Sequence, residues 1–233
     1  MLKVNNINTF YGQFQALHNV SFKIKDGELA VFLGSNGHGK STLLKTICGL
    51  LSPFSGQIEF NGHLINKLKI HNIVKLGIVY VPEEGHLFPE LTVKENLLMG
   101  AYNRRARKDR YRNEQLVYSI FTRLEERKHQ LASTLSGGER QMLAMGRGLM
   151  ASATLMAIDE PSMGLAPILK KSVFKKIKQI NDEEGLTIIL VEQEVEASLD
   201  ISDKAFVLRE GKIVLSEDSS KICIETIQKH YLV

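Results

Sequence analysis

The chain has 233 residues, 43% of them hydrophobic and 24% charged, with a formal net charge of +4 and two cysteines. These values are ordinary for a globular protein with one substantial core, and no apolar run approaches the roughly 20 residues that a membrane helix needs. The first ten residues lack the apolar segment of a signal peptide, so we expect a cytosolic chain that reaches a membrane only through a partner.

The beginning of the chain predicts strands, then a loop and a helix. Residues 2–24 have the pattern of two strands around a turn at Tyr11, and residues 29–33 form an apolar run typical of a buried strand. Residues 43–50 favour a helix. The segment between this last strand and the helix therefore connects the two.

That connecting segment has the pattern G-x-x-x-x-G-K-[ST] of a phosphate-binding loop. Its residues are Gly34, Ser35, Asn36, Gly37, His38, Gly39, Lys40, Ser41 and Thr42. Glycines let successive backbone N–H groups turn toward an anion, and the N-terminus of the next helix adds partial positive charge. Lys40 can reach the β- and γ-phosphates, and the Ser41 hydroxyl can bind Mg²⁺. The segment predicts binding of a nucleoside triphosphate.

The middle of the chain, residues 92–150, lacks strand patterns and has helical periodicity. Near its end stands the run Leu135-Ser136-Gly137-Gly138-Glu139-Arg140-Gln141. Ser136 followed by Glu139 predicts a capping box at a helix start, and the adjacent glycines indicate a close approach to the backbone. The free N–H groups of such a helix start can form a second phosphate site. Where it faces away from Lys40, this site can serve the loop of a second, facing chain.

Two acidic residues follow the apolar run 155–158. They are Asp159 and Glu160, and Pro161 ends the strand. One carboxylate at a strand end can hold Mg²⁺ through water, and another can activate the attacking water. We predict the first role for Asp159 and the second for Glu160.

The apolar runs predict a mainly parallel sheet covered on both faces, because they are too continuous for alternation. They are residues 29–33, 78–81, 155–158, 187–191 and 205–208. Residues 57–62 and 207–215, the latter with a turn at Glu210-Gly211, are typical of antiparallel strands.

The run 135–141 resembles the signature of ATP-binding cassette (ABC) ATPases, and its combination with the loop 34–42 and the acidic pair 159–160 makes the resemblance specific. The resemblance spans almost the whole chain. It implies an α/β fold: a P-loop NTPase (RecA-like) core with an antiparallel β-subdomain and an inserted helical subdomain. A single ABC ATPase domain would then have its core and β-subdomain in residues 1–85 and 151–233, and its helical subdomain in residues 86–150.

Four positions depart from the usual pattern of that family. Glu83 stands where the family usually has Gln, Gln193 where it has His, Ala166 where it has Asp, and His38 where a small residue is usual. We interpret His38 as a tolerated variant. The other three departures, together with the ending 227–232, resemble one of the two ATPase subunits of branched-chain amino-acid importers. Close relatives of that branch carry urea or short amides, so these solutes stay open as alternatives.

The resemblance also implies a role for each matching residue. ATP would be held by Tyr11, whose ring stacks on adenine, by the loop 34–42, and in trans by Ser136, Gly137 and Gly138. The implied catalytic residues are Lys40, Glu160 and Gln193, and the implied Mg²⁺ residues are Ser41, Asp159 and Glu83, partly through water. Because Gln193 can donate a hydrogen bond but cannot titrate, we expect hydrolysis without a titrating switch residue.

Partners follow from the same resemblance. They are membrane-spanning transporter subunits, a second ABC ATPase subunit that is identical or non-identical, and indirectly an extracytoplasmic solute-binding protein. The chain would lie in the cytoplasm on the inner face of the cell membrane. There, a groove between the helical subdomain and the core would receive a helix of the membrane subunit.

A basic cluster favours a different class, a soluble ABC ATPase that acts on nucleic acid or ribosomes. The cluster comprises Arg104, Arg105, Arg107, Lys108, Arg110 and Arg112. A single cassette of this length, without a long coiled-coil insertion, disfavours that class, and we interpret the cluster as a solvated surface and expect no nucleic acid. A P-loop kinase or GTPase is disfavoured by the signature 136–141 and by the lack of a guanine-reading Asn-Lys-x-Asp run.

Overall fold

The computed structural model describes residues 1–231 and contains two sheets. An antiparallel sheet has the order β2-β1-β4-β5, and a larger sheet has the order β10-β9-β3-β8-β7-β6. The strands are β1 (Leu2–Tyr11), β2 (Phe14–Ile24), β3 (Leu29–Leu33), β4 (Ser55–Phe60), β5 (His63–Leu64), β6 (Ile78–Val81), β7 (Leu155–Asp159), β8 (Thr187–Glu192), β9 (Lys204–Arg209) and β10 (Lys212–Asp218). Leu232, in the tail that contributed to the resemblance, lies outside the described residues.

The helices fall between or after these strands, with three additions to those that the periodicity indicated. They are α1 (Lys40–Ile47), α2 (Ile70–Leu76), α3 (Val93–Gly100), α4 (Arg104–Lys108), α5 (Arg110–Ile120), α6 (Thr122–Glu126), α7 (Gly137–Met150), α8 (Pro167–Glu184), α9 (Val195–Ile201) and α10 (Ile224–Tyr231). The sequence did not predict α2, α9 and α10, because about two turns are too short to show a clear period. Within the described residues, no helix combines the length and apolar character that a membrane crossing requires.

The large sheet is covered on both faces, as its continuous apolar runs predicted. Every residue of β3, β7 and β8 is buried. Alternate residues face two separate cores: Val31 and Ile158 pack with α7 and α8, whereas Phe32 and Ala157 pack with α1 and the antiparallel sheet. The strands β3, β6, β7, β8 and β9 are parallel, and β10 is antiparallel at the edge. As a result, α1 and α7 lie on opposite faces of this sheet.

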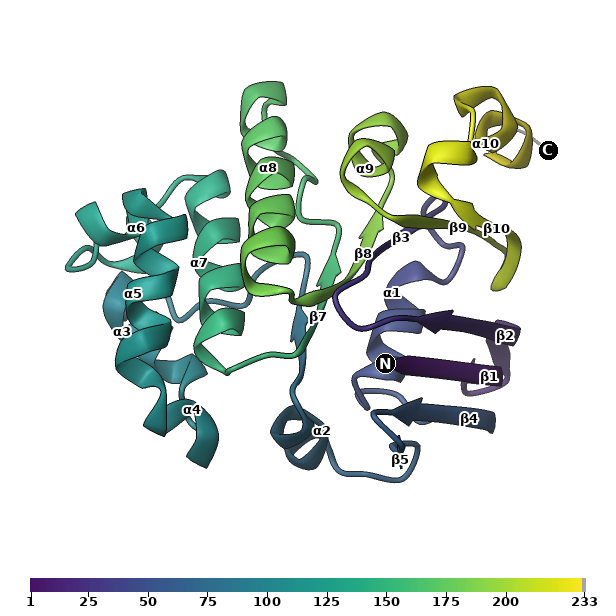
Figure 1. Ribbon diagram of the computed structural model, residues 1–233, viewed down its shortest axis with the longest axis horizontal. Helices are drawn as coiled ribbons and strands as arrows, with labels where there is room; N and C mark the ends of the chain where they lie inside the picture. Colours follow the sequence, from purple (N-terminus) through teal and green to yellow (C-terminus); the bar gives the residue numbers. More distant parts are fainter. Residues whose placement is uncertain (232–233) are drawn as a thin grey trace.

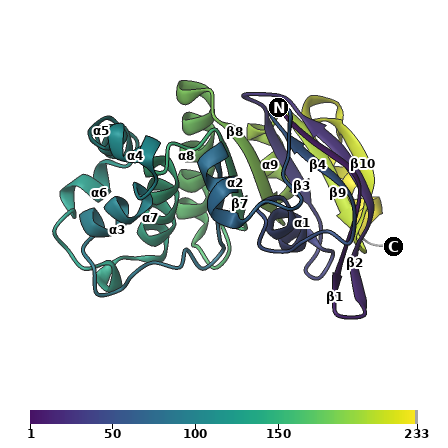
Figure 2. The same cartoon turned by 90° about the horizontal axis from the view of Figure 1, so that it is seen from below.

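Helices α3 to α7 gather at one end of the molecule, and the antiparallel strands lie at the other (Figure 1). The view from below shows the same separation (Figure 2). The helix starts follow local rules: Thr92 with Glu95, and Ser136 with Glu139, each form a complete capping box. The predicted subdomain boundaries at 85/86 and 150/151 enclose these helices and stay a prediction.

Close packing of α3 on α7 depends on Gly100. A Cβ at this position would lie 2.2 Å from the carbonyl oxygen of Arg147 and 2.9 Å from the Cβ of Met150. The two helix backbones therefore meet where a side chain has no room.

We predict that Gly100→Ala lowers the free energy of unfolding by about 1–3 kcal/mol, because the added methyl forces α3 and α7 apart. Gly138→Ala is the matched control, since its Cβ would meet only Leu169 at 3.5 Å and alanine is the better helix former by up to about 1 kcal/mol. Chemical denaturation of both variants measures the difference. An unchanged or increased stability of Gly100→Ala would contradict the close approach.

Candidate functional site

Three segments singled out from the sequence meet at one edge of the large sheet. The strands β3, β8 and β7 are parallel neighbours in that order, so their carboxyl ends share an edge. The loop 34–42 leaves β3, Asp159 ends β7 with Glu160 next to it, and Gln193 follows β8. In open α/β sheets this edge is where ligands bind.

The loop 34–42 requires glycine at two places where the backbone packs closely. A Cβ at Gly34 would lie 2.4 Å from the carbonyl oxygen of Leu208. Gly39 has φ of +95°, a conformation that favours glycine, and its Cβ would lie 2.9 Å from the carbonyl oxygen of Ala16. No side chain caps the start of α1, so its first N–H groups are free to bind an anion.

A buried ion pair joins the loop to the end of β7. The Nζ of Lys40 lies 2.9 Å from Oε1 of Glu160, and the two side chains are only 3% and 7% exposed. Lys40 also donates to the carbonyl oxygen of Ser35 at 3.1 Å. The amide of Gln193 donates to Oε2 of Glu160 at 2.5 Å and to Oδ1 of Asn36 at 2.7 Å. The three residues predicted as catalytic are thus brought into direct contact.

Asp159 is held by two hydroxyl groups. Its Oδ1 accepts a hydrogen bond from Ser41 Oγ at 2.9 Å, and its Oδ2 accepts one from the hydroxyl of Tyr80 at 2.7 Å. Burial raises the pKa of Asp159, and these two hydrogen bonds oppose the rise. The sequence did not single out Tyr80, because it lies inside an apolar run and nothing local marks its hydroxyl as paired.

The donor set at this point fits Mg²⁺. Mg²⁺ prefers oxygen ligands and is commonly bound by one or two carboxylates together with substrate phosphates. The Ser41 hydroxyl and the Asp159 carboxylate lie side by side, and both line a cavity of ≈ 790 Å³ that Tyr11 and Glu83 line as well. Burial raises the pKa of the Glu83 carboxyl, and the nearby Glu160 and Asp159 charges raise it further.

A further carboxylate, Glu192, holds two loops of the site together and was not singled out from the sequence. Its Oε1 accepts a hydrogen bond from the backbone N–H of Ser162 at 3.0 Å, and its Oε2 accepts one from the N–H of Gln193 at 3.1 Å. It therefore ties the loop after Glu160 to the loop after β8. The sequence did contain one indication of this role. Glu192 is an acid at the end of a fully apolar strand, and a buried carboxylate there needs hydrogen-bond donors.

The signature residues Ser136, Gly137 and Gly138 lie at the start of α7, away from the Lys40 loop. Ser136 caps this helix, and its hydroxyl also donates to Glu139 at 2.8 Å. Because α7 packs on the opposite face of the sheet from α1, the fold does not bring this helix start to Lys40 within one chain. The role of these residues in trans stays a prediction.

Helix α7 also holds the backbone of the segment that carries Glu83. Gln141 donates to the carbonyl oxygen of Glu83 at 2.5 Å. The guanidinium of Arg147 donates to the carbonyl oxygens of Gly85 at 2.7 Å and His86 at 2.8 Å. The signature helix therefore contacts the segment whose residue Glu83 lines the cavity beside Asp159.

Comparison with known proteins agrees with this geometry. A family model described as ABC transporter matches residues 17–163. The high-affinity branched-chain amino acid transport ATP-binding protein BraG of Pseudomonas aeruginosa is 44% identical over 223 residues, 95% of this chain and 94% of BraG. The probable branched-chain amino acid transport ATP-binding protein LivF of Archaeoglobus fulgidus is 39% identical over 95% of this chain and 94% of its own length.

Solved structures give the same result. The cbiO1 protein from Clostridium perfringens, part of an ABC transporter complex, has a TM-score of 0.84 and 29% identity over 98% of this chain and 91% of its own. The dimeric cassette MJ0796 bound to ADP and Pi has a TM-score of 0.81 and 25% identity over 94% of this chain and 99% of its own. These matches confirm the fold class and the resemblance, and they show that the chain belongs to the ABC transporter family as an ATP-binding cassette with ATPase activity.

Proposed function

We propose that this cassette energises the import of branched-chain amino acids. The ATPase role is supported above all by the contact of Lys40, Glu160 and Gln193 at one sheet edge. The solute is supported by the 44% identity to BraG over nearly the whole chain. Urea or short amides are the alternative solutes.

The site residues then divide the chemistry of ATP hydrolysis. Lys40 and the free N–H groups of α1 bind the phosphates, and a γ-phosphate offers Lys40 a second anionic partner besides Glu160. Glu160, with one oxygen held by Gln193, accepts a proton from the attacking water. Ser41 and Asp159, with Glu83 on the same cavity wall, would hold Mg²⁺, which would neutralise charge on the phosphates. Tyr11 stacks on adenine in this proposal, which its 45% exposure and its position on the cavity wall support.

A second ATPase chain completes each site in this proposal. Its support is the separation of α1 and α7 on opposite faces of one sheet, which would let the helix start at Ser136 serve the phosphate of another molecule. A non-identical partner would make the two nucleotide sites chemically unequal. The printed description of MJ0796 as a dimer is in keeping with such an arrangement.

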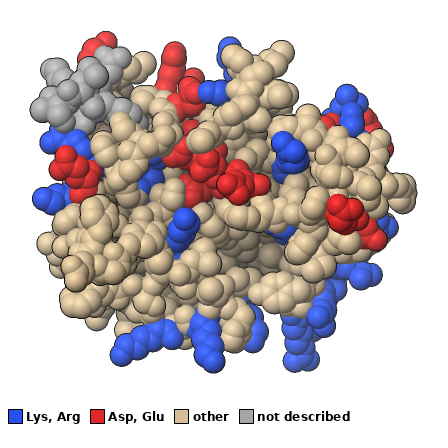
Figure 3. All heavy atoms as spheres, turned by 180° about the vertical axis from the view of Figure 1, so that it is seen from behind, with Lys and Arg blue, Asp and Glu red and all other residues tan. Residues whose placement is uncertain are grey.

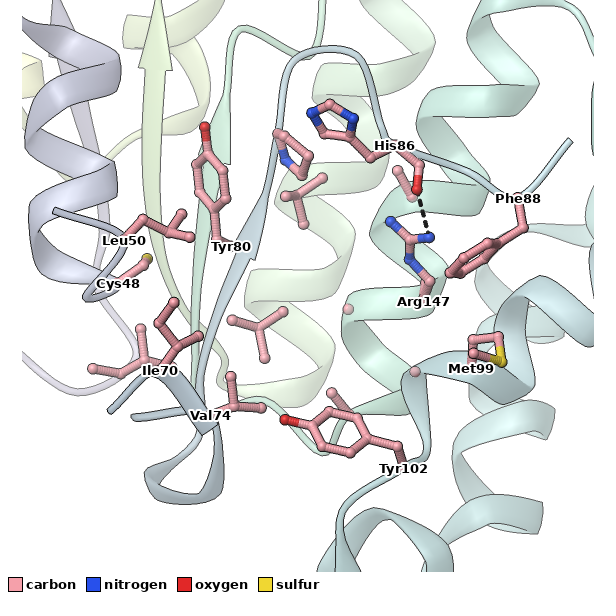
Figure 4. Close-up of a pocket in the computed structure, with 18 residues that line it drawn as sticks. Cys48, Leu50, Ile70, Val74, Tyr80, His86, Phe88, Met99, Tyr102 and Arg147 are labelled. Atoms are coloured by element: carbon pink, nitrogen blue, oxygen red, sulfur yellow. Dashed lines mark hydrogen bonds between the residues drawn. The ribbon is translucent and has the colours of Figure 1, made fainter. Parts of the chain in front are cut away.

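The membrane-spanning subunit is proposed to dock in an apolar groove between the core and the helical end. This groove has a volume of ≈ 410 Å³ and includes Ile70, Val74, Met99 and Tyr102 on its walls (Figure 4). Next to it lies a cavity of ≈ 560 Å³ lined by Lys75, Asn103, Arg104, Arg105 and Lys108, with no acidic residue of the described chain on its wall. Figure 3 shows the hollow on this face, with Lys and Arg side chains projecting along the edge below it.

This combination fits an amphipathic helix whose apolar face fills the groove and whose acidic flank meets the basic edge. Such docking would hold the cassette on the inner face of the cell membrane. The solute-binding protein would act only indirectly, through the membrane subunits.

We predict that Glu160→Gln keeps ATP binding and lowers the hydrolysis rate by about 10²- to 10⁴-fold, because the base is lost while the side-chain shape remains. Phosphate release measures the hydrolysis rate, and solution mass with and without Mg-ATP measures ATP-dependent association. The exposed Glu126→Gln is the control. A doubled mass with ATP would mean that the chain closes on itself, and a monomer with bound ATP would favour a non-identical partner. Hydrolysis at the wild-type rate would remove Glu160 as the base.

The solute is tested by uptake in cells that lack this chain. We expect lower uptake of labelled leucine, isoleucine and valine, restored by the wild-type chain but not by Lys40→Ala, since the phosphates then lose their cation. Uptake of urea and acetamide should stay unchanged. Loss of urea or amide uptake instead, with normal leucine uptake, would replace the proposed solute by the alternative.

The docking groove is tested by charge reversal at its basic edge. We expect Arg104→Glu with Lys108→Glu to reduce co-purification with the membrane-spanning subunits while leaving ATP binding unchanged, because the acidic flank of the docked helix is then repelled. Arg110→Glu with Arg112→Glu is the matched control, with the same change of charge outside this cavity. Equal loss in both variants would show that overall charge, and not the groove edge, is recognised.

A further inference from the structure

Tyr80 joins two places that the proposed function keeps separate, the docking groove and the metal carboxylate. It lies on β6, whose residue Tyr80 pairs with Ala157 of the parallel strand β7, two residues before Asp159. Tyr80 lines both the groove and the cavity that contains Asp159. Figure 4 shows its ring beside Leu50, with the hydroxyl directed away from Val74 and Tyr102.

The hydroxyl of Tyr80 fixes one of the two oxygens of Asp159. With Ser41 donating to Oδ1 and Tyr80 donating to Oδ2, each carboxylate oxygen has its own donor. The torsion that turns a carboxylate is soft and has two broad, equivalent minima, so a single donor leaves the plane of the group poorly defined. Two donors from different elements, one on α1 and one on β6, define it.

The second effect of this hydrogen bond is to satisfy a buried polar atom. Asp159 is 2% exposed, and a buried carboxylate oxygen without a donor costs free energy. The Tyr80 hydroxyl thus keeps the carboxylate of Asp159 oriented and its second oxygen paired.

We propose that Tyr80 is a positioning residue for Mg²⁺, acting through Asp159, an inference that rests on the proposed metal role of Asp159. Partners that orient a metal-binding side chain are worth about 10- to 100-fold in metal affinity. Loss of the hydroxyl should weaken metal binding and leave nucleotide binding unchanged, because the Tyr80 hydroxyl donates to the carboxylate of Asp159.

The test compares Tyr80→Phe with wild type by electron paramagnetic resonance of Mn²⁺, used as the probe metal in the presence of protein-bound ATP. We expect the Mn²⁺ concentration for half-saturation to rise by about tenfold, with ATP affinity in EDTA unchanged. Tyr118→Phe, the same change at a buried tyrosine of α5, is the matched control and should match wild type.

Asp159→Asn separates failure of this inference from failure of the proposed metal site. Weaker Mn²⁺ binding in Asp159→Asn together with unchanged binding in Tyr80→Phe would overturn the role of Tyr80 alone. Unchanged Mn²⁺ binding in Asp159→Asn would overturn the metal site itself. Loss of ATP affinity in EDTA in Tyr80→Phe would also overturn the inference, because the hydroxyl would then support the pocket and not the metal.

Discussion

The candidate site is organised by a buried charge pair at the carboxyl edge of the parallel sheet. Removing Lys40 and Glu160 from water costs several kcal/mol per ion, and their attraction offsets this cost only if further hydrogen bonds complete the geometry. The carbonyl of Ser35 and the amide of Gln193 supply those bonds. The pair therefore contributes little to stability by itself, and its position on the loop 34–42 fits the proposed site, in which a nucleotide phosphate competes with Glu160 for Lys40.

The strand order makes this pair possible. The three segments involved are far apart in the chain, and only the adjacency of β3, β8 and β7 brings them together. Glu192 then ties together the two loops that follow β7 and β8, because each loop donates a backbone hydrogen bond to its carboxylate. Gln193 occupies the position where the family usually has a titrating residue, and its amide donates to both Glu160 and Asn36 without changing charge.

A second set of contacts links this edge to the helical end. Helix α7 begins at the signature, and its Gln141 and Arg147 donate hydrogen bonds to backbone carbonyl oxygens of the segment 83–86. That segment borders the groove proposed for the membrane subunit, and Tyr80 reaches from the same groove to Asp159. The signature helix, the groove proposed for docking and the carboxylate proposed to hold Mg²⁺ are thus connected through hydrogen bonds and the short segment 80–86.

The sequence by itself determined the local features of this protein. The loop 34–42, the acidic pair at the end of β7 and the capping box at Ser136 depend on spacing within a few residues. The continuous apolar runs indicated buried parallel strands, because both faces of such a sheet are covered. Only the tertiary structure decided which of these features meet. Three contacts join residues from different elements: the Tyr80 hydroxyl with Asp159, Glu192 with the two loops, and Arg147 with Gly85. No local pattern encodes a contact that packing alone creates.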